Sequence, residues 1–340
     1  SRMKILAVDV GTGTQDILLF DSEREPENFL KLIMPSPTLR VAARLRQATA
    51  EKRPILLTGV TMGGGPSHWA AEDHRRAGLP LYATADAARS FNDDLSLLEQ
   101  EMGLRIVSED EASALRDVER IELRDFDWEP IRQAFAAFGV PLVLDGLAVA
   151  VFDHGAAPPN ESDRRFRLNY LAERLAQRNH LATFAFPADQ IPPVMTRLRA
   201  VADSARRQVD DLPLLVMDTA PAAVLGALED PQVHAQQDGV IVNVGNFHTL
   251  AFCLHGGEVA SLFEHHTGLL DQSTLEDWLE QLATGTISNE AVFAAMGHGA
   301  WLRDHRSEGR GLTFVAVTGP RRSLLQGSRL PVYFAVPHGD

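Results

Sequence analysis

The feature that most constrains the fold is a strand–turn–strand pattern that occurs twice along the chain. The first copy, "ILAVDVGTGTQDILLFD", lies close to the start and has two apolar runs around a turn of glycines and threonines. The second copy, "GVIVNVGNFHTLAFCL", can be laid on the first so that Asn243 falls on Asp9 and Gly245 on Gly11. Apolar runs on both sides of a glycine turn are typical of paired strands. Because the element recurs far along the chain, we predict a duplicated architecture.

Each copy is followed by a third predicted strand, "NFLKLIM" in the first half and "GGEVASLFEHHTG" in the second. Further strands are predicted at "PILLTG", "LPLYAT", "LPLLVMD", "LTFVAVTGP" and "LPVYFAV", with amphipathic helices between many of them. The acidic segment "EDEASALRDVERIELRDFDWEPIRQAFAAFG" is predicted to be mostly helical or surface-exposed. Glu229-Asp230-Pro231 is the predicted boundary between a first domain, residues 1–230 with helical insertions, and a second, residues 231–340.

Composition limits the classes of function. The formal net charge of -14 argues against general binding to nucleic acid or to an anionic membrane, because both need a basic face. Cys253 is the sole cysteine, so an internal disulfide and a cysteine-ligated iron–sulfur cluster are both excluded. No apolar stretch is long enough to span a bilayer, and no signal-peptide pattern is present. We therefore expect a cytoplasmic protein with a small-molecule substrate, and a natural chain that continues beyond Asp340.

The first turn has the composition of a phosphate cradle. Its glycines let the backbone approach a ligand, and successive N–H groups in such a turn can converge on an anion. Asp9, at the end of the preceding strand, would repel a phosphate but suits Mg²⁺ held through water. The alternative is a tight hairpin with no ligand. The predicted ligand-binding residues of this turn are Gly11, Thr12, Gly13, Thr14 and Gln15.

A second glycine-rich loop, "TGVTMGGGPSHW", stands between a predicted strand and a predicted helix. Gly63, Gly64 and Gly65 would allow close approach of a ligand and would aim a helix N-terminus at it, which suits an anion. The same residues would also serve as a flexible turn. We predict that this loop contacts a ligand.

Two candidate acid–base residues follow a predicted buried strand in "FDHG". Asp153 could act as a general base or hold a metal-bound water, and His154 could carry a proton near neutral pH. The alternative is a surface turn closed by the glycine. The basic helix after it carries Arg164, Arg165 and Arg167, which either hold a phosphate or acidic substrate or, for at least two of them, form a solvated face.

The pair His265 and His266, with Glu264 beside it, raises the question of a metal site. Adjacent side chains on a strand point to opposite faces, and no H-x-x-x-H pattern or cysteine pair accompanies them. We therefore predict no metal at this pair, and Asp9 is the predicted metal-binding residue.

Four segments together resemble the actin, heat-shock chaperone and sugar-kinase superfamily. "ILAVDVGTGTQDILLFD" resembles its first phosphate motif and "GVIVNVGNFHTLAF" its second. "MDTAPAAVLGAL" resembles the connecting helix, and "FVAVTGP" is similar to the adenosine motif, a strand that ends at glycine. The four occur in the superfamily's order and span nearly the whole chain.

This resemblance implies an α/β fold with two ribonuclease-H-like (actin-like ATPase) domains, in which mixed sheets are flanked by helices and Mg-ATP binds in a cleft between the domains. It implies that Asp9 holds a magnesium-bound water. The remaining cofactor-binding residues that it implies are Asn243, Gly245, Asn246 and Gly319. Asn243 stands where the superfamily has an acid, and Phe247 stands among the expected glycines, and both departures disfavour hydrolysis of ATP.

"TMGGGP", "FDHGAAPPNESDRRFR" and "VPHGD" resemble a closer, prokaryotic family of unsettled function, whose members are often labelled pyruvate formate-lyase activating enzymes. A radical S-adenosylmethionine activase holds its iron–sulfur cluster with three closely spaced cysteines. Cys253 alone cannot do this, and we do not adopt the label.

The sequence thus predicts an ATP-dependent phosphotransferase or ATPase that acts on a small molecule, with ATP and Mg²⁺ as cofactors and with Asp9, Asp153 and His154 as catalytic residues. The alternative is a non-catalytic, nucleotide- or ligand-binding regulatory protein of the same fold, which Asn243 and Phe247 favour.

Overall fold

The computed structural model describes residues 1–209, 211–304 and 311–336, which divide into two compact units. The first unit contains Ser1–Asp153 and Phe186–Met217, and the second contains His154–Ala185 and the residues from Asp218 onward. This division differs from the expected single boundary near Asp230. Helix α7 (Asp163–Gln177) belongs to the second unit because its buried Arg167 is paired with Glu264 of that unit's sheet.

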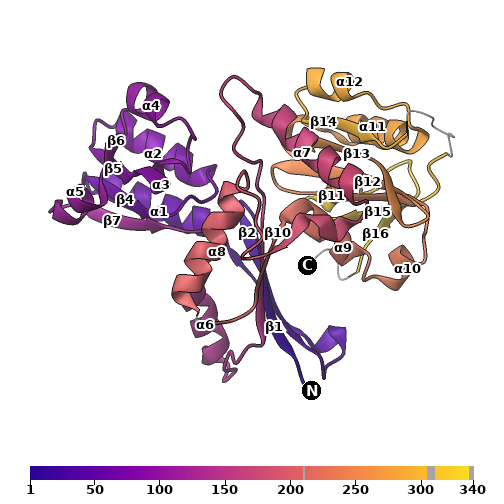
Figure 1. Ribbon diagram of the computed structural model, residues 1–340, viewed down its shortest axis with the longest axis horizontal. Helices are drawn as coiled ribbons and strands as arrows, with labels where there is room; N and C mark the ends of the chain where they lie inside the picture. Colours follow the sequence, from indigo (N-terminus) through magenta and orange to yellow (C-terminus); the bar gives the residue numbers. More distant parts are fainter. Residues whose placement is uncertain (210, 305–310, 337–340) are drawn as a thin grey trace. The chain divides into compact units, whose positions relative to one another are not determined.

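The main sheet of the first unit has the strand order β3-β2-β1-β8-β10-β9. Strands β1 and β2, which are labelled in Figure 1, pair antiparallel. Strand β1 also pairs parallel with β8, and β2 pairs antiparallel with β3. The strands are β1 (Lys4–Val10), β2 (Thr14–Asp21), β3 (Leu30–Pro35), β8 (Gly146–Val151), β9 (Ala185–Pro187) and β10 (Leu214–Asp218).

The sheet of the second unit has the order β14-β13-β12-β11-β15-β16. Strand β11 pairs antiparallel with β12 and parallel with β15, and β12 pairs antiparallel with β13. The strands are β11 (Gly239–Val244), β12 (His248–His255), β13 (Glu258–His266), β14 (Gly299–Leu302), β15 (Val315–Thr318) and β16 (Val332–Phe334).

The two sheets share one topology. In each, a meander of three antiparallel strands places its first strand at the centre, a fourth strand lies parallel beside that first strand, and a fifth lies beyond. The hairpins also match in register: Asp9 lies opposite Asp16 in the first, and Asn243 lies opposite Leu250 in the second. This is the ribonuclease-H-like order, and it confirms the predicted α/β class and the repeat.

Strand β1 shows why this sequence forms a central strand. Leu6, Val8 and Val10 alternate with partly exposed residues and are at most 2% exposed, so one face of the strand is fully packed. Asp9 falls on the other face. A polar residue is tolerated there because that face is only half buried.

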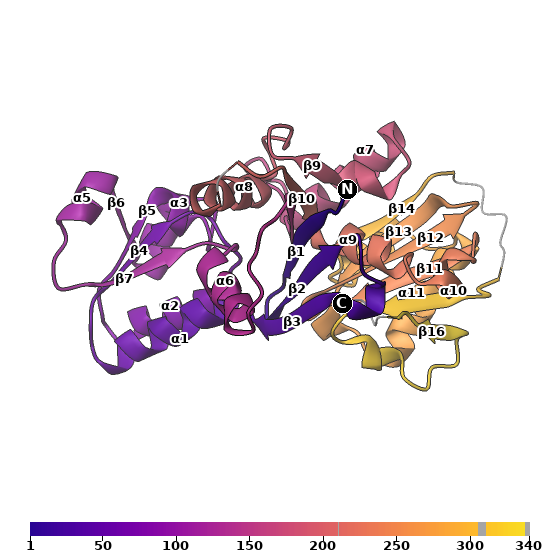
Figure 2. The same ribbon diagram turned by 90° about the horizontal axis from the view of Figure 1, so that it is seen from below.

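An insertion after β3 carries a separate parallel sheet with the order β6-β5-β4-β7. Its buried core joins the sheet to helices α1 and α2, which lie side by side on one face (Figure 2). The elements are α1 (Pro37–Ala50), β4 (Ile55–Gly59), α2 (Pro66–Arg76), β5 (Leu81–Thr84), α3 (Ala85–Ala88), α4 (Leu95–Leu97), β6 (Arg105–Val107), α5 (Glu109–Ala114) and β7 (Glu119–Leu123). Helix α6 (Trp128–Ala137) follows the insertion.

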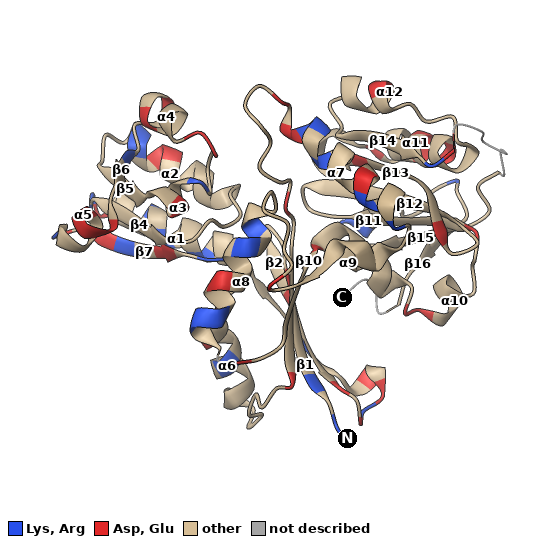
Figure 3. Ribbon diagram, viewed as in Figure 1, with Lys and Arg blue, Asp and Glu red and all other residues tan. Residues whose placement is uncertain are grey.

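The insertion is therefore α/β rather than helical as expected. Strand β7 falls in the acidic segment that we predicted to be helical or surface-exposed. Its sequence, ERIEL, alternates charged residues with the fully buried Ile121 and Leu123, which is the period of a strand. Strand β7 carries both acidic and basic residues (Figure 3), and its acidic side chains form ion pairs with neighbouring arginines, such as Glu119 with Arg44 at 2.8 Å.

In the second unit, helix α11 (Gln272–Thr284) covers one face of the sheet through Leu275, Leu279 and Leu282. Helix α9 (Thr219–Ala227) contacts β11, β12 and β15. The remaining helices are α7, α10 (Pro231–His234) and α12 (Asn289–Ala294) in this unit and α8 (Thr196–Gln208) in the first.

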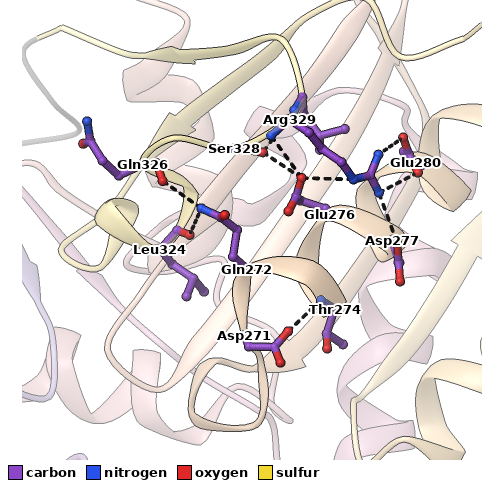
Figure 4. A network of polar contacts seen from close by, with 11 residues as sticks. Asp271, Gln272, Thr274, Glu276, Asp277, Glu280, Leu324, Gln326, Ser328 and Arg329 are labelled. Atoms are coloured by element: carbon purple, nitrogen blue, oxygen red, sulfur yellow. Dashed lines mark hydrogen bonds and ion pairs between the residues drawn. The ribbon is translucent and has the colours of Figure 1, made fainter.

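The segment before β16 is tied to α11 by a polar network (Figure 4). Arg329 contacts Glu276 at 3.2 Å, Asp277 at 3.1 Å and Glu280 at 2.5 Å, and the Gln272 amide donates to the backbone carbonyl of Gln326. These contacts fix the connection between β15 and β16 against the helix that covers the sheet.

Among the described helices, none combines the length and the apolar character needed to cross a membrane.

Candidate functional site

The first turn is closed by a hydrogen bond from the Gly11 amide to the Thr14 carbonyl, at 2.9 Å. A Cβ on Gly11 would lie 2.8 Å from that carbonyl oxygen, so glycine is required here by the close backbone approach. Ser36, at the start of α1, binds the other carbonyls of the turn: its hydroxyl donates to Thr12 and its amide to Gly13.

This arrangement leaves one side of the turn available for a ligand. Among the described residues, the Thr12 and Gly13 amides donate to no other group, whereas both carbonyls are bound by Ser36. The turn is half buried rather than enclosed. Adjacent N–H groups with their carbonyls turned away form a concavity that suits an anion. The Thr12 and Gly13 amides are therefore placed as the predicted phosphate cradle requires, and phosphate binding itself stays a prediction.

Asp9 lies directly opposite Asp16 across the hairpin, and both carboxylates lie on the half-buried face. Like charges at directly opposed positions destabilise a strand pair unless a cation compensates them. Carboxylate oxygens are the ligands that Mg²⁺ prefers. The donor set thus fits the magnesium ion that the resemblance implies.

Asp16 was not among the predicted site residues. The signal for it was present in the sequence, because a two-residue turn at Thr12-Gly13 fixes the register and so pairs residue 9 with residue 16.

Gln15 points to the opposite, buried face of β2 and is 5% exposed. Its amide nitrogen donates to the Pro35 carbonyl at 3.0 Å, which anchors the end of β3. Within the described residues its Oε1 accepts no hydrogen bond. The contacts of Gln15 thus support the turn from behind.

The second turn reproduces the backbone of the first. The Gly245 amide donates to the His248 carbonyl at 3.0 Å, and a Cβ on Gly245 would lie 2.7 Å from that oxygen. Asn243 is buried, and Gly319, at the end of β15, is packed against Val244 and the Asn243 side chain. The structure therefore brings together three of the predicted residues, Asn243, Gly245 and Gly319, with Asn246 in the turn between the strands.

The chemistry of the second turn differs from that of the first. Neither carboxylate of the first hairpin has a counterpart, because Asn243 and Leu250 occupy the equivalent positions. Phe247 takes the place of the second glycine and is 38% exposed. His248 takes the place of Thr14. The second turn keeps the shape of a cradle but lacks the acidic pair.

The triple-glycine loop surrounds a buried ion pair. Arg197 binds Asp125 with two hydrogen bonds, at 2.8 and 3.0 Å, and also donates to the Phe152 carbonyl at 2.6 Å. The Gly63 amide donates to Asp125, and a Cβ on Gly63 would overlap the Arg197 guanidinium. Gly65 begins α2 with a φ of 70°. Packing around Arg197 explains at least Gly63 without any ligand.

This packing predicts the effect of a single methyl group. Gly63→Ala should lower the free energy of unfolding by about 1–3 kcal/mol, the usual cost of overpacking. Gly146→Ala is the matched control in the same unit, because its Cβ would lie 3.6 Å or more from its neighbours. Chemical denaturation of both variants measures the difference. A Gly63→Ala protein as stable as the control would show that the loop does not pack tightly on Arg197.

Asp153 and His154 fall on different units. Asp153 is 2% exposed and accepts a hydrogen bond from the Leu198 amide at 2.9 Å, in the first turn of α8. His154 is exposed, and its Nδ1 lies 2.7 Å from the Gly155 carbonyl. Asp153 therefore has a helix-capping contact. Of the "VPHGD" segment, all but Val336 lies outside the described residues.

The three arginines of α7 have separate roles. Arg164 donates to the carbonyls of Phe293 and Gly297, Arg165 pairs with Glu290 at 3.0 Å, and Arg167 is fully buried between two carboxylates. Arg167 therefore forms no part of a solvated face, which we expected for at least two of the three arginines.

Two ribonuclease-H-like sheets in one chain define the class: the fold is that of the actin-like ATPases. Within this class, the chain belongs to the family described as "Putative pyruvate format-lyase activating enzyme (DUF1786)", whose profile matches residues 62–324. The first turn lies before the matched segment.

A search of solved structures gave several matches of low similarity. A Bacteroides thetaiotaomicron protein with actin-like ATPase fold and unknown function is 7% identical, with 99% of this chain and 93% of that chain covered and a TM-score of 0.35. The ethanolamine utilization protein EutJ from Carboxydothermus hydrogenoformans is 13% identical, with 98% of this chain and 84% of that chain covered and a TM-score of 0.28. The ROK hexokinase from Thermus thermophilus is 15% identical, with 76% of this chain and 48% of that chain covered and a TM-score of 0.24.

The chain spans 38% of the length of a similar ROK-family transcriptional regulator and 48% of that of the hexokinase. A search of curated protein sequences found no match. Likenesses at these TM-scores do not extend to the positions of individual side chains.

The family description carries an activity that the cysteine content of this chain does not support. Cys253 is buried, and burial raises the pKa of its thiol to about 11, which keeps it protonated.

We predict that anaerobic reconstitution with iron and sulfide gives no stoichiometric cluster, as read from absorption and spin-resonance spectra, because such clusters need several thiolates. One cluster per chain would contradict this.

Proposed function

We propose that the chain binds Mg-ATP through the turn Gly11–Thr14 and transfers the terminal phosphoryl group to a small-molecule acceptor. The observation that carries the proposal is the turn itself, in which the Thr12 and Gly13 amides are available while Ser36 holds the carbonyls. Asp9 and Asp16 would hold Mg²⁺ beside the phosphates. When bound, the metal neutralises phosphate charge, which is most of what phosphoryl transfer requires.

In the transfer, the bond from the γ-phosphorus to the bridging oxygen of ADP breaks, and a new bond forms to the acceptor oxygen. The acceptor's proton passes to a base, for which Asp153 and His154 are the proposed residues. Because Asp153 also accepts the Leu198 amide, Asp153→Asn should lower stability as well as turnover. The turnover rate of Asp153→Asn is therefore compared with that of the wild type after both are divided by the amount of folded protein.

A second candidate function is a non-catalytic nucleotide-binding regulator. Asn243 in place of an acid and the partly exposed Phe247 in the second turn favour it, because both weaken a second phosphate contact.

Calorimetry with ATP, with and without Mg²⁺, combined with an assay for ADP release, tests both candidates. Magnesium-dependent binding with turnover supports the phosphotransferase or ATPase, and binding without turnover selects the regulator. If the wild-type chain binds no nucleotide in the presence of Mg²⁺, both candidates fail.

A further inference from the structure

Three histidines that are far apart in the sequence converge in the second unit. His248 begins β12, His266 ends β13, and His298 directly precedes β14. Their ring centroids lie 4.8–5.4 Å apart in all three pairs, and one nitrogen from each lies within 4.8 Å of the others. The sequence does not show this convergence, because the three histidines are far apart in it and His266 has only His265 as a histidine neighbour.

The strand register holds the three rings in place. His248 and His266 are directly opposed in the β12–β13 pair, and the hydroxyls of the next residues, Thr249 and Thr267, hydrogen-bond at 2.9 Å. The His298 amide donates to the Glu264 carbonyl at 2.9 Å. His265 points to the other face and packs on Trp278, as expected for neighbours on a strand. The cluster is therefore built by backbone pairing and does not depend on flexible loops.

Burial lowers the pKa of His248 to about 3 and that of His298 to about 4, and it also lowers the pKa of His266. The nearby guanidinium of Arg167 adds to this effect, but its charge is balanced by Asp218 and Glu264.

His298 has a buried ring nitrogen without a hydrogen-bond partner in the described part of the chain. The residue is 4% exposed, and its Nδ1 has no hydrogen-bond partner among the described residues. The nearest acceptor, the Glu264 carboxylate, is 3.8 Å away. Metal-binding histidines typically direct one nitrogen to a carboxylate and the other to the metal. Closing the short gap to Glu264 would orient His298 in this way.

We propose that His248, His266 and His298 bind a divalent transition-metal cation of the zinc type, with one coordination position left for water or a further ligand. Three imidazoles are a ligand set for Zn²⁺ with an open position. Zinc–nitrogen bonds of about 2.0–2.1 Å place the nitrogens roughly 3.3 Å apart, so the rings need to close by about 1.5 Å at most.

The cluster also accounts for the altered second turn. His248 occupies the position that Thr14 has in the first turn, with the same backbone hydrogen bond to the glycine. The second copy thus has the same strand–turn–strand backbone as the first, with a histidine where the first has a threonine. Since His248 and His266 are only half buried, a cation can reach the site from solvent.

The test uses the tag-free full chain after treatment with a chelator, titrated with Zn²⁺ alone by calorimetry and with Co²⁺ by visible absorption. We expect one ion per chain, a dissociation constant in the micromolar range or tighter, and the absorption bands of four-coordinate cobalt. His266→Gln should weaken binding by at least about 100-fold, since loss of a second-shell partner already costs 10–100-fold.

His234→Gln is the matched control, because His234 is exposed in the same unit. It should bind like wild type. His248→Gln gives a second loss-of-ligand variant should His266→Gln not fold. Absence of zinc binding in wild type, or binding equal in wild type, His266→Gln and His248→Gln, would overturn the proposal. Because the probe is the metal alone, the result is independent of nucleotide binding.

Discussion

Asp9→Ala should abolish magnesium-dependent ATP binding and leave the fold intact. A carboxylate that organises Mg²⁺ contributes roughly 2–4 kcal/mol to the metal–nucleotide complex, the scale for loss of one partner of a close charge pair. Stability should change by at most about 1 kcal/mol, because Asp9 lies on the half-buried face and its removal relieves the opposition to Asp16. Calorimetry with Mg-ATP and a melting curve on the same variant measure both effects.

Three further variants decide between the cradle and a plain hairpin. Gly13→Val should weaken binding to a similar extent, because the side chain blocks approach to the turn amides. Asp16→Ala should weaken it through the metal, and Glu27→Ala, an exposed acid of the same unit, should have no effect. A plain hairpin predicts the reverse pattern, in which ATP is indifferent to Asp9→Ala and Gly13→Val costs only stability.

The repeat could be recognised in the sequence because both hairpins keep the period of a strand and a glycine at the same point of the turn. At Gly11 and Gly245 the constraint is local, since each Cβ would meet a carbonyl three residues on. Local constraints of this kind can be recognised in a short stretch of sequence, and the central strands and the first glycine turn were predictable for that reason.

The features that could not be predicted depend on partners that are distant in the sequence. The requirement for Gly63 comes from Arg197, and the place of α7 in the second unit comes from Glu264, 97 residues beyond Arg167. Strand β7 was not predicted because its charged residues are typical of a helix or a surface segment. In the structure they form ion pairs at the edge of the insertion's sheet. The histidine cluster required the register of β12 on β13, which composition does not reveal.

Arg167 is the centre of the ion cluster that joins α7, β13 and the start of α9. Its side chain is completely buried, with bonds of 3.0 and 3.1 Å to the Glu264 carboxylate and of 2.9 Å to Asp218. Burial would raise the pKa of Glu264, but the Arg167 guanidinium outweighs burial and lowers it to about 2. Asp218 in turn accepts the Ala220 amide at the first turn of α9. One cation therefore compensates two carboxylates that water does not reach.

Arg167→Ala should destabilise the second unit by about 3–5 kcal/mol, because it leaves two buried carboxylates without a partner. Arg165→Ala on the same helix is the control: its partner Glu290 is exposed, so the loss should stay within about 1 kcal/mol. The combination of Arg167→Met with Asp218→Asn and Glu264→Gln removes all three charges and should recover part of the loss. Denaturant unfolding of the three proteins gives the comparison. Equal stability of Arg167→Ala and Arg165→Ala would mean that the buried network contributes nothing to holding α7 on its sheet.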